Sequence, residues 1–190
     1  MRAGVWKTRS IVVCLFMLMG AGCQQYPVAT LDSGKAPQPG LSGPVAISAV
    51  RAICEPPAGW MAKPLEMNRG RAQQTWVSPS GSTAYGVIAF RLPLPVGSDL
   101  ALWGFLGEMR KQYSDGRLLS KKADPTLPGV RFLAEGGPYR LRTNLILHGA
   151  SGWAVYAGTL RDRPEDPDEL KLAERAREST AVGLIEQAAR

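Results

Sequence analysis

Runs of apolar residues broken by proline and glycine divide the chain into short strands and two helices. The pattern predicts strands at Gln74–Val77, Ala84–Leu92, Arg117–Lys121, Val130–Glu135, Tyr139–His148 and Trp153–Leu160. Ala84–Leu92 is apolar or aromatic at nearly every position, which is typical of a strand buried on both faces. Pro- and Gly-rich turns such as Ser78-Pro79-Ser80-Gly81 separate the strands. The sequence therefore predicts a sheet built from consecutive strands.

Two segments carry helical periodicity instead. Behind an N-cap at Ser98 or Asp99, apolar side chains recur at the spacing of one helix face: Leu102, Phe105, Leu106, Met109 and Tyr113. The second helix begins at Asp166, with Pro167 in its first turn and Glu169 placed to complete a capping box. Its predicted packing face is made of Leu172, Ala173, Ala176 and Thr180, and we expect it to run to about Val182. The order of elements predicts an α+β fold, an antiparallel sheet flanked by helices.

The last two strands are joined by Gly149–Gly152, which indicates a β-hairpin. If these residues form a four-residue loop, Arg140 lies opposite Arg161, with Arg142 and Arg163 nearby. Like charges directly opposed are destabilising. We expect that the acidic segment 162–169 neutralises the four arginines, or that they bind an anion such as a carboxylate, a phosphate or a polyanionic envelope glycan.

The N-terminus has the three parts of a secretory signal. A basic head (Arg2, Lys7, Arg9) precedes the apolar stretch 11–19 and the small residues 20–22, which end at Cys23. The run before Cys23 resembles a bacterial lipoprotein signal, in which the cysteine is lipidated and becomes the new N-terminus. An ordinary secretory peptide with an incidental Cys23 is the competing interpretation, because Gly20 stands where such signals usually have leucine. A membrane-spanning helix is disfavoured, since the apolar stretch 11–21 has 11 residues and a span needs about 20.

These features predict three parts of the chain: a signal peptide at 1–22, a lipidated cysteine with a flexible linker at 23–45, and one globular domain at 46–190. Residues 24–44 are rich in Pro, Gly and small polar residues, as in a tether. Acyl chains on Cys23 would hold the protein stably in a membrane. In the lipoprotein family an Asp after the cysteine commonly marks retention in the inner membrane, and here Gln24 follows it. We therefore expect the outer membrane, with the domain facing the periplasm.

Charge and cysteine content narrow the range of partners. Residues 1–22 hold three of the 23 basic residues and none of the 16 acidic ones, so the mature chain is only mildly basic. Its basic residues form no block, and with export this argues against a nucleic-acid partner. Cys54 would be the one remaining thiol of the mature chain, and a small buried role is favoured over a reactive one, because its neighbour Glu55 is a carboxylate rather than a base or cation.

Candidate catalytic chemistry is limited to one pair. The chain has a single histidine, His148, so it lacks the histidines of a multi-histidine zinc centre, and neither a metal site nor a cofactor is expected. His148 with Ser151 could form a base and a nucleophile, although Gly149–Gly152 is better explained as a hairpin turn. The acidic run from Asp162 to Glu169 lacks the spacing of a calcium loop.

Three short motifs carry a resemblance to a known fold family. Pro57-Ala58-Gly59-Trp60, Trp76-Val77-Ser78-Pro79 and Gly152-Trp153-Ala154-Val155-Tyr156 resemble segments of the PsbP-like and Mog-type proteins, over roughly residues 50–185. This resemblance implies an α/β/α sandwich and a role in binding, as in extrinsic subunits of photosystem II or partners of a small GTPase.

Two classes of function follow. The favoured one is a non-catalytic binding or assembly module, anchored in the cell envelope and possessing an envelope protein partner. The alternative is a small envelope hydrolase that uses Ser151 and His148.

Overall fold

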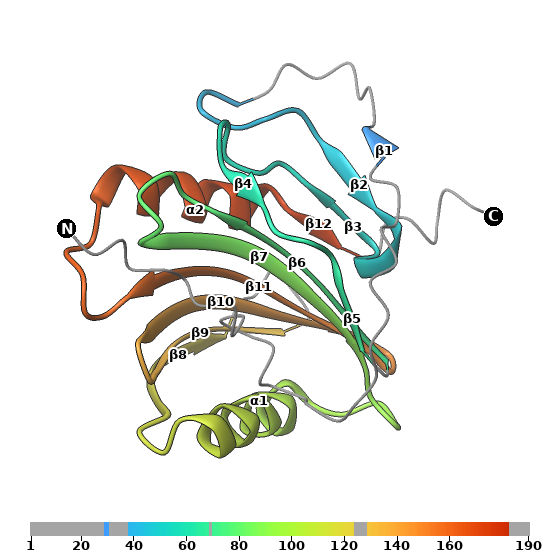
Figure 1. Cartoon of the computed structure of the whole chain (residues 1–190). Coiled ribbons are helices and arrows are strands. Elements are labelled where there is room, and N and C mark those ends of the chain that lie inside the picture. Colours follow the sequence, from blue (N-terminus) through green and yellow to red (C-terminus); the bar gives the residue numbers. More distant parts are fainter. Residues whose placement is uncertain (1–28, 31–37, 69, 124–128, 183–190) are drawn as a thin grey trace.

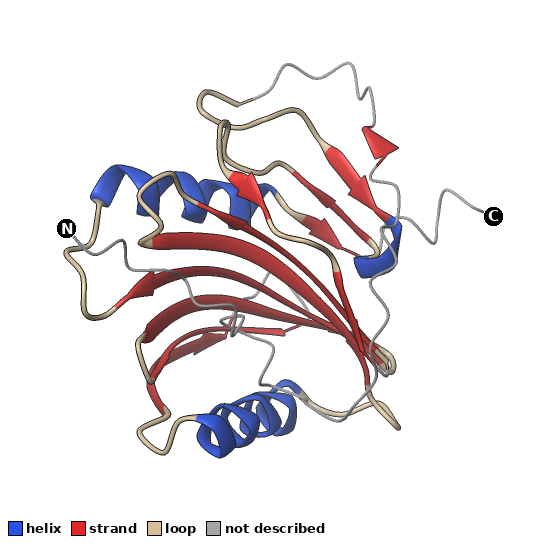
Figure 2. Cartoon of the chain, viewed as in Figure 1, coloured by secondary structure: helices blue, strands red, loops and turns tan. Residues whose placement is uncertain are grey.

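A computed structural model describes residues 29–30, 38–68, 70–123 and 129–182 of the chain. The predicted signal peptide, Cys23 and most of the predicted linker lie outside the described residues. The described part holds two antiparallel sheets and two α-helices, α1 (Ser98–Gln112) and α2 (Pro167–Ser179) (Figures 1 and 2).

The larger sheet has the strand order β4-β6-β7-β11-β10-β9-β8, and β5 also pairs with β6. Its strands are β4 (Met61–Ala62), β5 (Glu66–Asn68), β6 (Arg71–Val77), β7 (Thr83–Arg91), β8 (Arg117–Ala123), β9 (Gly129–Gly136), β10 (Tyr139–His148) and β11 (Ser151–Leu160). All six long strands were predicted, several of them one to three residues too short. Every neighbouring pair is antiparallel.

The smaller sheet has the order β1-β2-β3-β12, with a 3-10 turn, η2, beside it. Its elements are β1 (Ala29–Thr30), β2 (Val45–Ile47), η2 (Ser48–Val50), β3 (Ala52–Cys54) and β12 (Ala181–Val182). The sequence analysis missed this sheet, because strands of two or three residues are too short to show a period.

The two helices lie on opposite faces of the large sheet, which makes an α/β/α sandwich (Figure 1). On one face the buried residues of α1 pack against β9 and β10; they are Leu102, Phe105, Leu106 and Met109, four of the five predicted. On the other face Leu170, Ala173 and Ala176 of α2 join the small sheet in covering β6, β7 and β11. The predicted α+β fold class is confirmed.

The helices are offset from each other. α2 packs on β7 and β11 in the middle of the sheet, whereas α1 packs on β8, β9 and β10 at one side. Each helix therefore covers only part of its face.

Tryptophans fix the core on the α2 side. Trp76 stacks on Tyr85 with ring centroids 5.1 Å apart. Trp153 is 2% exposed, and its indole Nε1 donates to the carbonyl oxygen of Val50 at 2.9 Å, which ties β11 to the small sheet. A buried indole N–H needs such a partner.

The hairpin has a different loop from the one predicted. His148 pairs with Ser151 across a two-residue turn, Gly149-Ala150, in which Gly149 has a φ of 57°. Glycine adopts this left-handed conformation without steric cost, so the strands continue to the turn. Compared with the pairing that a four-residue loop would give, the two strands are shifted by two residues. Arg140 therefore lies opposite Thr159 rather than Arg161. A shift of two preserves which face each side chain occupies.

Helix α2 begins as predicted, but its capping box does not form. Asp166 Oδ1 accepts hydrogen bonds from the backbone N of Asp168 (3.0 Å) and of Glu169 (3.2 Å). The Glu169 carboxylate instead accepts from the Ser80 hydroxyl at 2.6 Å and the Ser82 hydroxyl at 3.3 Å. Glu169 therefore ties the start of α2 to the turn between β6 and β7.

The end of α2 was placed too late. The helix ends at Ser179, and residues 181–182 form β12, which pairs with β3. The Thr180 hydroxyl donates to the carbonyl oxygen of Ala176 at 2.7 Å. Residues 181–182 can pair as a strand only because β3 lies beside them in the folded protein. The helical periodicity of the sequence does not contain this contact, so the predicted helix was too long.

The packed part of the chain begins before residue 46. Leu41 is buried in the core, and Leu172 of α2 lies against Gly40, where a Cβ would be 2.7 Å from its Cδ2. Leu41 also forms an isolated bridge with Pro57. The end of the predicted linker thus belongs to the folded domain.

Replacing Asp166 by Ala should lower the free energy of unfolding by about 1 kcal/mol, because two backbone N–H groups lose their acceptor. Asp166→Ser should keep most of the stability. Asp162 lies in the same loop and has no side-chain partner among the described residues, so Asp162→Ala is the control and should have little effect. Urea unfolding followed by circular dichroism measures the difference; equal losses in the two alanine variants would contradict the capping role.

Candidate functional site

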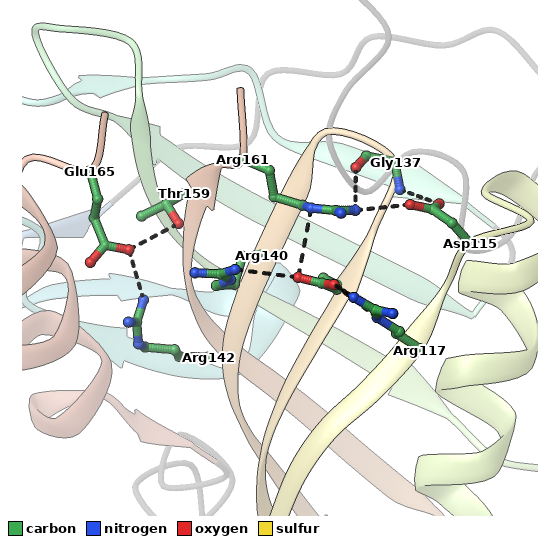
Figure 3. A network of polar contacts seen from close by, with 9 residues as sticks. Asp115, Arg117, Gly137, Arg140, Arg142, Thr159, Arg161 and Glu165 are labelled. Atoms are coloured by element: carbon green, nitrogen blue, oxygen red, sulfur yellow. Dashed lines mark hydrogen bonds and ion pairs between the residues drawn. The ribbon is translucent and has the colours of Figure 1, made fainter. Parts of the chain in front are cut away.

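Three of the four predicted arginines, Arg140, Arg142 and Arg161, lie together at one end of the large sheet, near the end of α1 (Figure 3). Arg140 and Arg142 alternate along β10 and share the face that α2 covers in part, while Arg161 and Arg163 follow the end of β11. Each of the four contacts oxygen atoms of the protein itself. Arg163 Nη1, for example, donates to the carbonyl oxygen of Ser80 at 3.4 Å.

Glu135 is the centre of this network. Its side chain is 3% exposed, and three arginines from different elements surround its carboxylate. Arg117 of β8 donates from Nη2 (2.6 Å) and Nε (2.9 Å), Arg140 approaches at 3.5 Å and Arg161 at 3.6 Å. The hydrogen bonds from Arg117 lower the pKa of Glu135, and the charges of Arg161 and Arg117 add to this against the opposing effect of burial. Glu135 therefore stays ionised and joins β8, β10 and the segment after β11.

Asp115 extends the network to the end of α1. It accepts from Arg161 Nη1 at 2.8 Å and from the backbone N of Gly137 at 2.7 Å, and these contacts, the Gly137 bond first, lower its pKa. Arg161 also donates to the Gly137 carbonyl oxygen at 3.0 Å. Gly137 has a φ of 55°, and a Cβ there would lie 2.3 Å from the ring of Tyr113, so this turn requires glycine.

Arg142 joins the sheet to α2. It pairs with Glu165 at 3.5 Å and with Glu174 at 3.2 Å, and Thr159 donates to Glu165 at 3.5 Å. From the acidic segment 162–169, Glu165 pairs with a predicted arginine, Arg142. The other partners come from elsewhere in the chain.

The sequence analysis therefore missed Arg117, Glu135, Asp115 and Glu174. A signal for Glu135 was present, because Gly136-Gly137-Pro138 is a turn sequence that pairs Glu135 with Arg140 across a short hairpin. The bonds to Asp115 and Glu174 carry no such signal, because they join segments that are distant in the sequence.

Arg177 of α2 was also missed. Its side chain is only 10% exposed and pairs with Glu178 at 3.5 Å. Burial lowers the pKa of this guanidinium, with a smaller contribution from the nearby Arg131 and Arg142, while Glu174 and Glu178 oppose the shift. The network on this face thus continues along α2.

The candidate catalytic pair lies at the opposite end of the hairpin. Because His148 and Ser151 are directly opposite in the register, their side chains share one face of the sheet. His148 is exposed and Ser151 is half-buried, and the described part of the chain records no hydrogen bond between them. Cys54 is fully buried, and burial raises the pKa of its thiol to about 12, which keeps it protonated. This agrees with the small buried role favoured for Cys54.

An apolar cavity lies on the α1 face, between β7 and the start of α1. Its volume is about 340 Å³. The apolar residues that line it are Ile88, Phe90, Leu92, Val96, Leu100 and Phe105. Leu100, which lines the cavity, is 64% exposed. Two further large apolar side chains close to it in the sequence are exposed as well, Leu94 at 59% and Trp103 at 60%. No local sequence pattern indicates this cavity, although Leu100 and Trp103 lie off the predicted packing stripe of α1.

Two other kinds of site were sought in the described residues. They contain no group of three or more His, Cys, Asp or Glu side chains placed to hold a metal ion. Within the same residues, none of the helices combines the length and apolar character needed to cross a membrane.

Comparisons with known proteins support the fold. No family model matches the chain, and no curated protein is similar in sequence. The structure is similar to the solution structure of cyanobacterial PsbP (CyanoP) from Synechocystis sp. PCC 6803, with a TM-score of 0.56 and 13% sequence identity. The similarity covers 81% of this chain and 98% of that one. The PsbP-like fold is therefore shown.

Glu135→Gln should destabilise the domain by about 1–3 kcal/mol at neutral pH, since three arginines lose their shared anion. Folding lowers the pKa of Glu135 below its usual 4.5, so the ionised carboxylate stabilises the fold above pH 4.5. This stabilisation is lost as the pH falls through the lowered pKa of the folded protein. The difference between wild type and variant should therefore shrink below pH 4.5.

Urea unfolding at a series of pH values tests this expectation. Asp115→Asn is the control, because Asp115 is half exposed and contacts a single arginine, so its effect should be smaller. A constant difference between Glu135→Gln and wild type down to pH 2 would show that the charge of Glu135 does not stabilise the fold.

Proposed function

We propose that this protein is a binding or assembly module, held in the cell envelope by a lipid on Cys23, with its domain facing the periplasm from the outer membrane. The N-terminal signal pattern supports the anchor. The described domain supports the binding role, because its fold presents an apolar surface that its own residues leave uncovered.

The exposed apolar side chains around the cavity are the observation that carries the binding role. Leu94, Leu100 and Trp103 each expose more than half of their surface. Leu100 and Trp103 are three residues apart on α1, so they share one side of the helix. Clustered apolar exposure beside a cavity is typical of a surface that meets a partner. An envelope protein is the partner we infer.

The arginine network supports stability more than binding. Arg140, Arg142 and Arg161 pair with carboxylates of the domain, so an external anion would have to compete with Glu135, Glu165 and Asp115. Anion binding by Arg140, Arg142, Arg161 and Arg163 stays a prediction.

An envelope hydrolase that uses Ser151 and His148 is the second candidate. The two-residue turn favours it, because it places the two side chains directly opposite each other on one face. The binding role is preferred, since the described residues record no hydrogen bond that would activate the Ser151 hydroxyl.

The anchor makes the first prediction for this function. Protein purified from membranes should yield an N-terminal peptide that begins at Cys23 and carries acyl mass in mass spectrometry. Cys23→Ser should abolish this peptide, because the hydroxyl of Ser cannot replace the thiol that is lipidated. An unmodified N-terminus elsewhere would make the protein a freely secreted domain.

The binding surface makes the second prediction. In detergent extracts of envelopes, Trp103→Ser should reduce the capture of a cross-linked partner protein by at least about tenfold, as expected for an interface anchor. Met61 is 58% exposed on β4, so Met61→Ser is a control of similar exposure outside this surface. Quantitative mass spectrometry compares the two captures; equal retention by both variants would count against the role of Trp103.

A further inference from the structure

The cavity beside α1 exists because small residues face it. Ala101 and Gly104 line it from the helix, and Ala154 lines it from β11. α1 packs on β8, β9 and β10, and the small side chains at Ala101 and Gly104 leave the space beside β7 unfilled. A Cβ on Gly104 would meet nothing within 4 Å. The void is therefore a property of the helix position and of these residues.

Among the charged residues that line the cavity, Arg71 is the one whose side chain faces it. Arg71 of β6 lines the cavity and shares the α1 face with Phe90, its partner in the register. Arg91 also borders the cavity, but it follows Ala89 at the two-residue spacing of the α2 face, so its side chain belongs to the opposite side of the sheet. The described residues that line the cavity include no carboxylate. Glu66 lies on the same face as Arg71, opposite Gln73 in the register, and balances part of this charge. The cavity thus has apolar walls and one positive end.

A row of buried polar groups holds Arg71 in position. Arg71 is 9% exposed and donates from Nη2 to Gln73 Oε1. Gln73 donates in turn to Thr75 Oγ1 at 3.1 Å and to the Tyr156 hydroxyl at 3.4 Å. The Tyr156 hydroxyl reaches this row over Gly86, where a Cβ would lie 2.5 Å from it. The guanidinium is therefore fixed before any ligand arrives.

We propose that the cavity binds a single fatty-acid chain, with its carboxylate at Arg71 and its tail along Leu92, Val96 and Phe105. The volume of about 340 Å³ lies in the range of small-molecule sites. A carboxylate matches the positive end, because charge-assisted hydrogen bonds to arginine are strong. A tail longer than the cavity continues over exposed Leu100 and the neighbouring Trp103. The inference deepens the proposed binding role and rests on it.

The test uses the full-length protein in its native membranes. The probe is palmitic acid with a photoreactive diazirine on its chain, and the uncharged comparison is the corresponding hexadecanol. After irradiation, mass spectrometry should find the label in the segment Leu92–Arg110. Labelling elsewhere in the chain, or none, would overturn the proposal.

Two helical glycines supply the decisive comparison. Gly104→Leu extends into the cavity and should remove most of the labelling. Gly107 also has open space at its Cβ but does not line the cavity, so Gly107→Leu should label as wild type. Equal labelling of the two variants would overturn the site. Cooperative urea unfolding shows whether Gly104→Leu is folded. If it is not, Ala101→Leu is used in its place, because Ala101 lines the same cavity.

The head group is tested separately. Arg71→Gln should weaken labelling by the acid and leave labelling by the alcohol unchanged, whereas Arg91→Gln should label as wild type with both probes. An equal effect on both probes would overturn the carboxylate assignment. Partner capture and fatty-acid labelling separate the two proposals. If Trp103→Ser loses partner capture but the wild type takes up no fatty-acid label, the binding role stands and the fatty-acid site is overturned. If the wild type is labelled but captures no partner, the fatty-acid site stands and the proposed protein partner is overturned.

Discussion

The central strands β7 and β11 are apolar on both faces, and this constraint determines the architecture. Along β7, Tyr85 and Val87 belong to the core under α2, whereas Ala84 and Ile88 belong to the core under α1. A sheet of this kind is stable only when both faces are covered. One helix on each side, with the small sheet beside α2, provides that cover.

The offset between the two helices explains where polar and apolar features lie. α2 covers the middle of one face and leaves the β8–β10 part of that face to arginines and Glu135. α1 covers the β8–β10 part of the other face and leaves a cavity beside β7. The ion-pair network and the cavity are thus two consequences of one packing arrangement. Charge pairing takes the place of a covering layer at the network, whereas the cavity leaves apolar surface uncovered.

The interactions in the network also connect segments that are distant along the chain. Glu135 joins β8, β10 and the residues after β11, and Asp115 joins the end of α1 to the turn at Gly137. Breaking one buried member leaves several charges without a partner, which costs more than losing a surface ion pair. The charge-paired end of the sheet therefore contrasts with the exposed apolar side chains Leu100 and Trp103 of α1.

The sequence by itself determined the elements whose signals are local. Apolar runs bounded by Pro- and Gly-rich turns located the six long strands, the stripe from Leu102 to Met109 located α1, and Asp166-Pro167 located the start of α2, because each depends on neighbouring residues. The fold class followed from their order. Tertiary structure decided the rest: the hairpin register that moved Arg140 away from Arg161, the small sheet that ends α2 at Ser179, and the cavity. These depend on which distant segments meet and on how one helix is offset from another, and no local pattern encodes such contacts.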